Sequence, residues 1–302
     1  MDSHYPQFVM KRKTRAKCPT IIQGCVSTFQ FFRLRFRFGA IDSVAFPQGK
    51  TGNVIRGAIG AALYRRTPNA FRQLFDAEAG RPTASGLADP PRPLIFRAWE
   101  LDGRTIPAGE LFCFDAHVFA IREEWIPQFR TAFQELDLGR RRAALDCIQQ
   151  LDLDDRPQSG PCTIDLGGRE DRERVLLHFV TPTELKSGGE LVRDPGFGTL
   201  FKRLRDRISA LRALYCDGPL DIDFRALGDR ADRVRLVRSQ LEWQSARRRS
   251  TRTGQVHPIG GFTGEAEYEG DLGEFMPWLR AARWVGVGRQ TVWGKGDLRV
   301  AG

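Results

Sequence analysis

The stretch FFRLRFRF at residues 31–38 decides the first element of the fold. Its apolar side chains alternate with arginines at every second position, which is the period of a β-strand. One face of this strand is therefore apolar, and the other face carries Arg33, Arg35 and Arg37. The cationic face is either a solvated sheet surface or a surface that meets a phosphate backbone, and the pattern is compatible with both.

The rest of the first half alternates between helical and strand patterns. Small residues near 57–62 suit close packing of a helix on a sheet, and Pro68 favours a stop just past that helix. Trp125, Phe129 and Phe133 lie on one face of a second helix. In chain order we predict a helix at 54–66, a loop at 76–93, a strand at 110–120, a helix at 122–136, and strands in RRAALDCIQQLDL and PCTIDL.

The second half repeats this rhythm. Its clearest element is the helix at 197–215, whose leucines and phenylalanines follow helical spacing while most of its basic residues fall off that stripe. In chain order we predict a strand at 175–185, the helix at 197–215, strands at 233–243 and 261–270, a helix at 272–284 and a strand at 291–300.

Each half therefore has the order strand, helix, strand, strand, helix, strand. This order predicts an α+β chain of two tandem ferredoxin-like domains, the βαββαβ architecture that RNA-recognition (RRM-like) modules also use. The fold hosts many unrelated activities and does not decide the function. We expect a basic N-terminal tail at 1–29, a first domain at 30–170, and a second domain at 171–302 that carries a C-terminal Gly-rich loop.

Composition narrows the class of protein. The 302 residues include 47 Lys and Arg against 37 Asp and Glu, a formal charge of +10 that favours a polyanionic partner. The hydrophobic share of 41% argues against disorder and collagen. The six cysteines lack the two-residue spacing of zinc or redox motifs, and we find no signal peptide or membrane-spanning run. We therefore expect a cytoplasmic protein that does not bind a membrane.

The strongest local motif is GVGRQTVWGKG at residues 286–296. Glycines let a backbone approach another group closely, and successive amides can cradle a phosphate. The spacing does not fit a Walker loop, and the alternative is an ordinary tight loop between a helix and an edge strand. The residues that we expect to bind a phosphate chain here are Gly286, Gly288, Arg289, Gly294, Lys295 and Gly296.

A second basic segment runs from Arg225 to Arg252 with a net charge of +6. Its sub-run ARRRSTRTG contains Arg248 and Arg249 and is typical of a mobile loop. Such a run is either a solvated charged surface or part of an RNA-binding track.

Histidine is scarce in this chain. His117 and His178 lie in strand patterns, where a core or sheet-face histidine is expected, and His257 follows the arginine-rich run. The sequence contains no HxxxH pair, no persuasive carboxylate pair and no nucleophile elbow. We therefore expect neither a metal site nor a cofactor.

Several of these segments, taken in order, carry a family resemblance. In the first half they are VIRGAIGAALYRR, GLADPPRPLIF and IPAGELFCFDAHVF. In the second half they are FVTPTELKSGG, FKRLRDRISALRALY, LEWQSARRRSTRTG, IGGFTGEAEY and VGVGRQTVWGKGDLRV. Together they resemble a CRISPR repeat-processing endoribonuclease of the RAMP superfamily, over about residues 30–300.

The resemblance implies two tandem ferredoxin-like domains that bind CRISPR repeat RNA, both as precursor and as mature guide RNA. It implies one metal-independent cut per repeat, in which the ribose 2′-hydroxyl attacks the adjacent phosphate and leaves a cyclic phosphate and a 5′-hydroxyl. Such a reaction needs a general base, a proton donor and cations for the developing charge. Other CRISPR effector subunits and a second copy of the chain are further partners that the resemblance leaves open.

The chain departs from the family pattern at one point. Many relatives carry a catalytic His at or just before the first helix, and GKTGNVIRGAIGAALYRR contains none. The candidates for proton transfer are therefore Lys50, Tyr64 and His257, with Arg248, Arg249 and Arg252 assisting the Gly-rich loop in RNA binding. A non-catalytic RNA-binding subunit is one alternative. A metabolic enzyme with a nucleotide-binding loop is another alternative. The loop spacing, which does not fit a Walker loop, argues against it.

Overall fold

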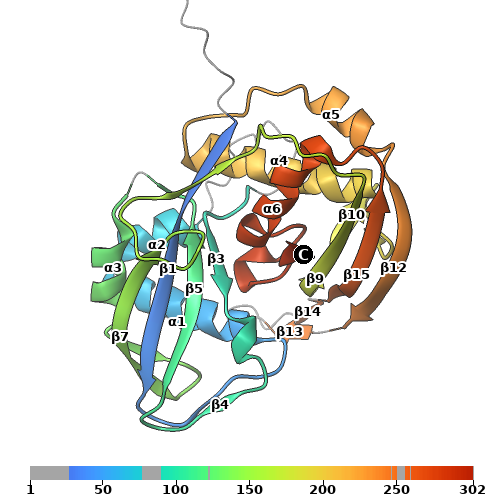
Figure 1. Cartoon of the computed structure of the whole chain (residues 1–302). Coiled ribbons are helices and arrows are strands. Elements are labelled where there is room, and N and C mark those ends of the chain that lie inside the picture. The colour runs from blue at the N-terminus through green and yellow to red at the C-terminus, as the bar shows by residue number, and fades with distance from the viewer. Residues whose placement is uncertain are drawn as a thin grey trace, which may run out of the picture.

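Two antiparallel sheets with helices packed on them make up the molecule (Figure 1). The computed structural model describes residues 27–76, 90–121, 123–245, 247–249, 256–258 and 260–301. The expectation of an α+β chain is confirmed. Most of the tail predicted at 1–29 and of the loop predicted at 76–93 lies outside the described residues, although the first strand already begins at Thr28.

The first sheet is six-stranded and is built around its longest strand. Leu34, Phe36 and Phe38 of that strand are buried against three helices, as their alternation with arginine predicts. The strand order is β3 (Leu94–Arg97), β5 (Leu111–Val118), β1 (Thr28–Ala40), β7 (Arg142–Leu151) and β6 (Glu135–Asp137), with β8 (Cys162–Asp165) paired to the start of β1. The helices are α1 (Thr51–Arg66), α2 (Pro68–Phe75) and α3 (Trp125–Ala132).

The second sheet has four strands. The longest helix of this half spans residues 197–215, as predicted. The strand order is β12 (Arg235–Gln244), β15 (Gly261–Glu269), β9 (Arg174–Thr183) and β16 (Leu298–Val300). The helices are α4 (Phe197–Tyr215), α5 (Phe224–Ala231) and α6 (Met276–Val285). Smaller strand pairs are β2 (Val44–Ala45) with β4 (Thr105–Ile106), β10 (Leu185–Ser187) with β11 (Glu190–Val192), and β13 (Arg247–Arg249) with β14 (Val256–Pro258). No described helix is long and apolar enough to cross a membrane.

Two predicted elements are wrong in extent. The strand predicted at 291–300 is a strand only from Leu298, because residues 291–293 form the 3₁₀ turn η3 (Thr291–Trp293). Gln290 and Gly294 flank this turn with φ angles of 64° and 78°, which an extended strand does not allow. The helix predicted at 122–136 ends at Ala132, although both Phe133 and Leu136 are buried as expected.

Strand β1 takes part in both hydrophobic cores. Its first residues, Phe29 and Phe31, belong to the core of the second half, and the Phe31 ring lies 5.6 Å from the ring of Trp284 in α6. Figure 1 shows α6 between the two sheets. The sheet face opposite α1 is thus partly covered by the second half, so the two halves share one continuous packed contact.

Candidate functional site

The Gly-rich loop closes on the start of α1. A Cβ atom added to Gly52, in the first turn of α1, would lie 2.8 Å from the carbonyl carbon of Trp293, which leaves no room for a side chain. The Nζ of Lys295 donates a hydrogen bond to the Gly49 carbonyl at 2.8 Å. We call residues 49–52 together with 291–296 the loop–helix junction. It joins segments about 240 positions apart in the sequence.

Burial and a hydrogen bond fix the first residues of α1. Lys50 is the N-cap residue and is exposed, whereas Thr51 is fully buried. The Thr51 amide donates to the Asp102 carboxylate at 3.1 Å, which supplies negative charge where a helix N-terminus favours it. Lys50 therefore stands as a solvent-facing cation on a fixed backbone.

The glycines of the loop serve the protein's own packing. Gly294 and Gly296 have φ angles of 78° and 72°, and a Cβ on Gly294 would lie 2.6 Å from the Phe96 carbonyl oxygen. The amides of Gly286, Gly294 and Gly296 donate to protein carbonyls at 2.8, 2.9 and 3.1 Å. These three amides therefore already have partners within the fold, and RNA binding by the loop glycines stays a prediction.

Lys295 lies inside the junction. This residue is only 7% exposed, and its ammonium group donates to the Gly49 carbonyl. Burial lowers the pKa of Lys295. Its hydrogen bond joins the loop to the start of α1, and the predicted contact of Lys295 with RNA stays a prediction.

A basic hollow of about 420 Å³ opens beside the loop. Five basic residues and one acid line it together with residues 288–293 of the loop: Arg92, Lys186, Arg203, Arg207, Arg289 and Glu184. Arg289 forms an ion pair with Glu184 and keeps more than half of its side chain exposed. We call this the loop hollow. Its excess of positive charge suits a phosphate backbone.

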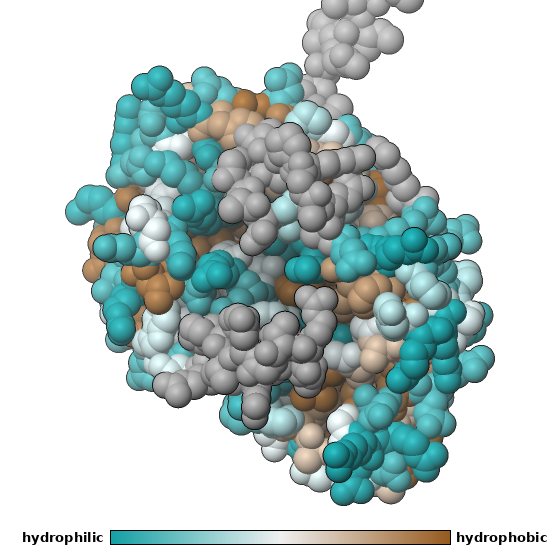
Figure 2. Space-filling view, turned by 180° about the vertical axis from the view of Figure 1, so that it is seen from behind, coloured by the Kyte–Doolittle hydropathy of each residue, from teal (hydrophilic) through white to brown (hydrophobic). Residues whose placement is uncertain are grey.

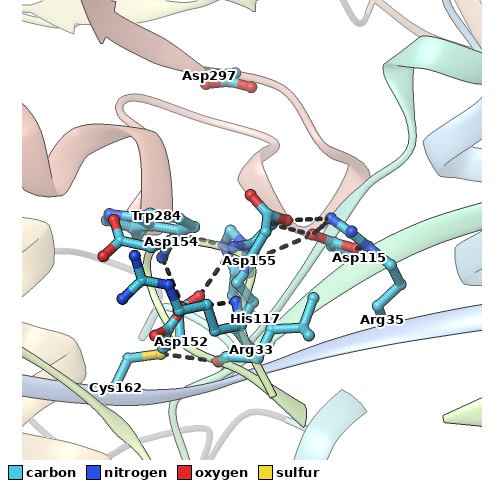
Figure 3. A network of polar contacts seen from close by, with 12 residues as sticks. Arg33, Arg35, Asp115, His117, Asp152, Asp154, Asp155, Cys162, Trp284 and Asp297 are labelled. Carbon is cyan, nitrogen blue, oxygen red and sulfur yellow. Dashed lines mark hydrogen bonds and ion pairs between the residues drawn. The ribbon is translucent and has the colours of Figure 1, made fainter. Parts of the chain in front are cut away.

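The arginine face of β1 is neutralised inside the fold (Figure 3). The Arg33 guanidinium lies 2.9 Å from the Asp115 carboxylate and 2.6 Å from that of Asp155, and Arg33 is only 4% exposed. Arg35 pairs with the same two carboxylates, and Arg37 pairs with Asp146. Arg33 and Arg35 line a cleft of about 430 Å³ between the halves, but their charges are already balanced by these carboxylates. Neither sequence reading, a solvated face or a phosphate-binding face, describes Arg33 and Arg35.

His117 lies at the base of this cleft as a buried, neutral histidine. Its Nδ1 is 2.7 Å from the Trp284 carbonyl, which can only accept, so Nδ1 carries the proton. Burial lowers the pKa of His117 to about 3, and the nearby Arg97 contributes in the same direction. His117 is therefore a contact between the halves, as its position in a strand pattern suggests, and not a proton-transfer group.

This burial predicts a pH-dependent stability. Between about pH 6.5 and 3 the unfolded chain binds a proton at His117 that the folded chain does not, so the free energy of unfolding falls as the pH falls. The slope contributed is at most about 1.4 kcal/mol per pH unit. Urea unfolding from pH 7 to 4.5 should show a shallower loss for His117→Asn, which keeps an N–H donor but does not titrate. Equal slopes for the two proteins would contradict a buried neutral His117.

The other two proton-transfer candidates lie on different elements, Tyr64 on α1 and His257 on β14. Tyr64 is 65% exposed near the other end of α1, about 21 Å from Lys50 at the helical rise of 1.5 Å per residue. His257 lies on β14, where its partner in the antiparallel pair is Arg248 of β13. Arg249 belongs to the same hairpin, and Arg252 lies outside the described residues. The structure thus separates Tyr64 from Lys50 and groups His257 with two arginines.

Sequence reasoning missed several residues of the site. Lys186 and Arg203 lie in segments we noted only as motifs, and Asp102 lies in a loop that carried no signal. The packing of the second half brings Lys186 and Arg203 to the loop, and the fold of the first half brings Asp102 to the start of α1. Seen from behind, the described surface shows broad hydrophilic patches with smaller apolar ones between them (Figure 2), which suits a polar partner.

Comparisons with known proteins relate the two halves of the chain to family models. Residues 177–298 match the model of the CRISPR-associated endoribonuclease Cas6 family, and residues 29–164 match a second model described as an N-terminal domain. No curated protein matches the chain.

Solved structures with a similar fold are also Cas6 proteins. The product complex of Cas6 (TTHB231), a Thermus thermophilus protein, has a TM-score of 0.60 and 18% identity, covering 90% of this chain and 100% of that one. The Cas6 (TTHA0078) product complex has a TM-score of 0.55 and 16% identity, covering 89% and 100%. Residues 177–298 thus match the Cas6 family, and the whole chain shares the fold of solved Cas6 structures.

Proposed function

We propose that the chain binds CRISPR repeat RNA at the loop hollow and cuts the precursor into guide RNAs at the loop–helix junction, without a metal ion. The observation that carries this proposal is the placement of exposed Lys50 beside the Gly-rich loop, which in turn lines the hollow with its five basic residues. The RNA backbone would lie along the hollow, and its scissile phosphate would reach Lys50.

The proposed chemistry is an internal transfer at phosphorus. The ribose 2′-oxygen loses its proton and forms a bond to phosphorus, the bond from phosphorus to the 5′-oxygen breaks, and that oxygen takes up a proton. Lysine is protonated at neutral pH, so Lys50 suits the roles of charge stabiliser and proton donor better than that of base. The base would be His257 of the β13–β14 hairpin, since a histidine pKa lies near neutrality.

We further propose that the two sheets are tandem ferredoxin-like domains divided near residues 165–174. In each half four neighbouring strands of the sheet, numbered in chain order, take the spatial order 2-3-1-4: β3-β5-β1-β7 in one, and β12-β15-β9-β16 in the other. One core draws only on residues of the first half, and the other lies mainly in the second half. Repeated order and separate cores support two related units.

A non-catalytic RNA-binding subunit is the second candidate. It is favoured by the sequence of the loop–helix junction, where neither 49–52 nor 291–296 contains a histidine. One similar structure is a partial Cas6-RT-Cas1–Cas2 complex, with 13% identity and a TM-score of 0.57, of whose chain this protein covers 47%. Association with other CRISPR subunits is a further proposal on this ground.

The test is cleavage of the cognate repeat RNA in excess chelator. We expect the wild-type chain to cut once per repeat, and Lys50→Met to lower the single-turnover rate about 100-fold, the usual weight of a proton-transfer group. Lys202→Met is the matched control, because Lys202 is a lysine of α4 bound to Asp232. A requirement for added divalent metal would overturn the mechanism, and tight binding without any cleavage would favour the second candidate.

A further inference from the structure

Lys295 is a basic residue at a buried position, which is unusual for a charged side chain. It lies in the loop between η3 and β16, is almost fully buried, and makes no ion pair with any described residue. The nearby negative charge of Asp102 favours the ammonium form, but burial opposes it more strongly, so the ammonium group depends on its hydrogen bond. The Lys295 ammonium group donates this hydrogen bond to the Gly49 carbonyl.

That carbonyl belongs to the turn that carries Lys50. The Lys50 amide donates to the Pro47 carbonyl at 3.1 Å, and Gly49 has a φ of 67°, so residues 47–50 form a tight turn into α1. A cation that holds the Gly49 oxygen restrains the peptide that leads directly to Lys50. Small displacements of that peptide move the whole Lys50 side chain.

The loop that carries Lys295 is itself anchored from two other strands. Thr181 of β9 donates its hydroxyl to the Gly294 carbonyl at 3.0 Å. Arg97 of β3 reaches the same carbonyl at 3.5 Å and the Arg283 carbonyl at 2.7 Å. Lys295 thus extends from a fixed base, and its bond transmits that fixed position to the turn before α1.

We propose that Lys295 is a positioning residue for RNA cleavage, which holds the Gly49–Lys50 turn in place through the Gly49 carbonyl and does not touch the RNA. The inference rests on the proposed function, since it assigns Lys50 to the cleavage centre. A positioning role and a phosphate-binding role for Lys295 predict different effects of its loss on RNA binding and on the cleavage rate.

The test is Lys295→Met, assayed for single-turnover cleavage and for RNA binding at several salt concentrations. We expect the rate to fall about 100-fold, the cost of a displacement of about 1 Å at a reacting group. We expect the dissociation constant and its salt dependence to stay as in the wild type. A phosphate contact would instead weaken binding and reduce the logarithmic salt slope by about 0.7 to 0.9, and that result would overturn the proposal.

Two further variants separate positioning from lost stability. Arg212→Met removes another buried cation that donates to carbonyls, including that of Thr28 across the two halves at 2.8 Å and that of Gly218, both of which lie outside the loop–helix junction. We expect it to lower the melting temperature without the cleavage defect. Lys295→Gln keeps an N–H donor and should recover part of the rate. If Arg212→Met loses cleavage to the same degree at the same melting temperature, Lys295 is merely structural.

A double-variant cycle with Lys50 tests the route of the effect. In a Lys50→Met background, Lys295→Met should cause no further loss of rate, because both changes remove the same group from the centre. Additive losses would overturn the proposal. If the wild-type chain does not cleave RNA, the proposed function fails, and amide hydrogen exchange still tests the inference: Lys295→Met should speed exchange across residues 47–52, and unchanged exchange would refute it.

Discussion

Gly52→Ala should lower the single-turnover rate of RNA cleavage about 100-fold or more. It should also lower the free energy of unfolding by about 1 to 3 kcal/mol. The added methyl group would lie 2.8 Å from the Trp293 carbonyl carbon and still closer to its oxygen. Both atoms are backbone, so the loop and the start of α1 must move apart. Single-turnover cleavage and urea unfolding measure the two effects.

The same helix supplies the matched control. Gly57 also lies within α1, but a Cβ added there meets no atom within 4 Å. Gly57→Ala should leave cleavage unchanged and should raise the free energy of unfolding by about 0.5 to 1 kcal/mol, because alanine loses less backbone entropy in a helix. If Gly52→Ala cleaves RNA as well as Gly57→Ala does, the reaction does not take place at the loop–helix junction.

The double variant Lys186→Ala, Arg289→Ala should weaken repeat RNA binding about 10-fold and reduce the logarithmic salt slope by about 1.4 to 1.8. Both side chains line the loop hollow, and each lost phosphate contact removes its share of counterion release. Binding titrations at several salt concentrations measure the slope. An unchanged slope would mean that RNA does not run through the hollow.

The control uses arginines on the open face of the second sheet. Arg174 and Arg235 lie 2.9 and 3.1 Å from the Glu269 carboxylate, and Glu265 and Glu267 lie on the same strand. This row of carboxylates neutralises the arginines and repels phosphate. Arg174→Ala, Arg235→Ala should therefore leave RNA binding unchanged. Equal weakening by both double variants would place the RNA on the sheet face.

Much of the secondary structure could be predicted because it depends on local spacing. The alternation in 31–38 and the helical spacing in 197–215 each place apolar atoms on one face, and burial of that face is the dominant favourable term. The prediction failed at 291–300, where glycine geometry and contacts with Phe96 and Val287 override strand propensity.

The sequence by itself determined the order of the elements, the excess of arginine and the presence of a Gly-rich loop. Only the tertiary structure decided which of those charges remain available. The charge of Arg33 is balanced by Asp115 and Asp155, which lie 82 and 122 positions away in the sequence. Lys295 donates a hydrogen bond to the Gly49 carbonyl, 246 positions away. A charge acts through its neighbours in space, and chain spacing does not encode those neighbours. The loop hollow, whose lining comes from both halves, likewise exists only once the halves have packed together.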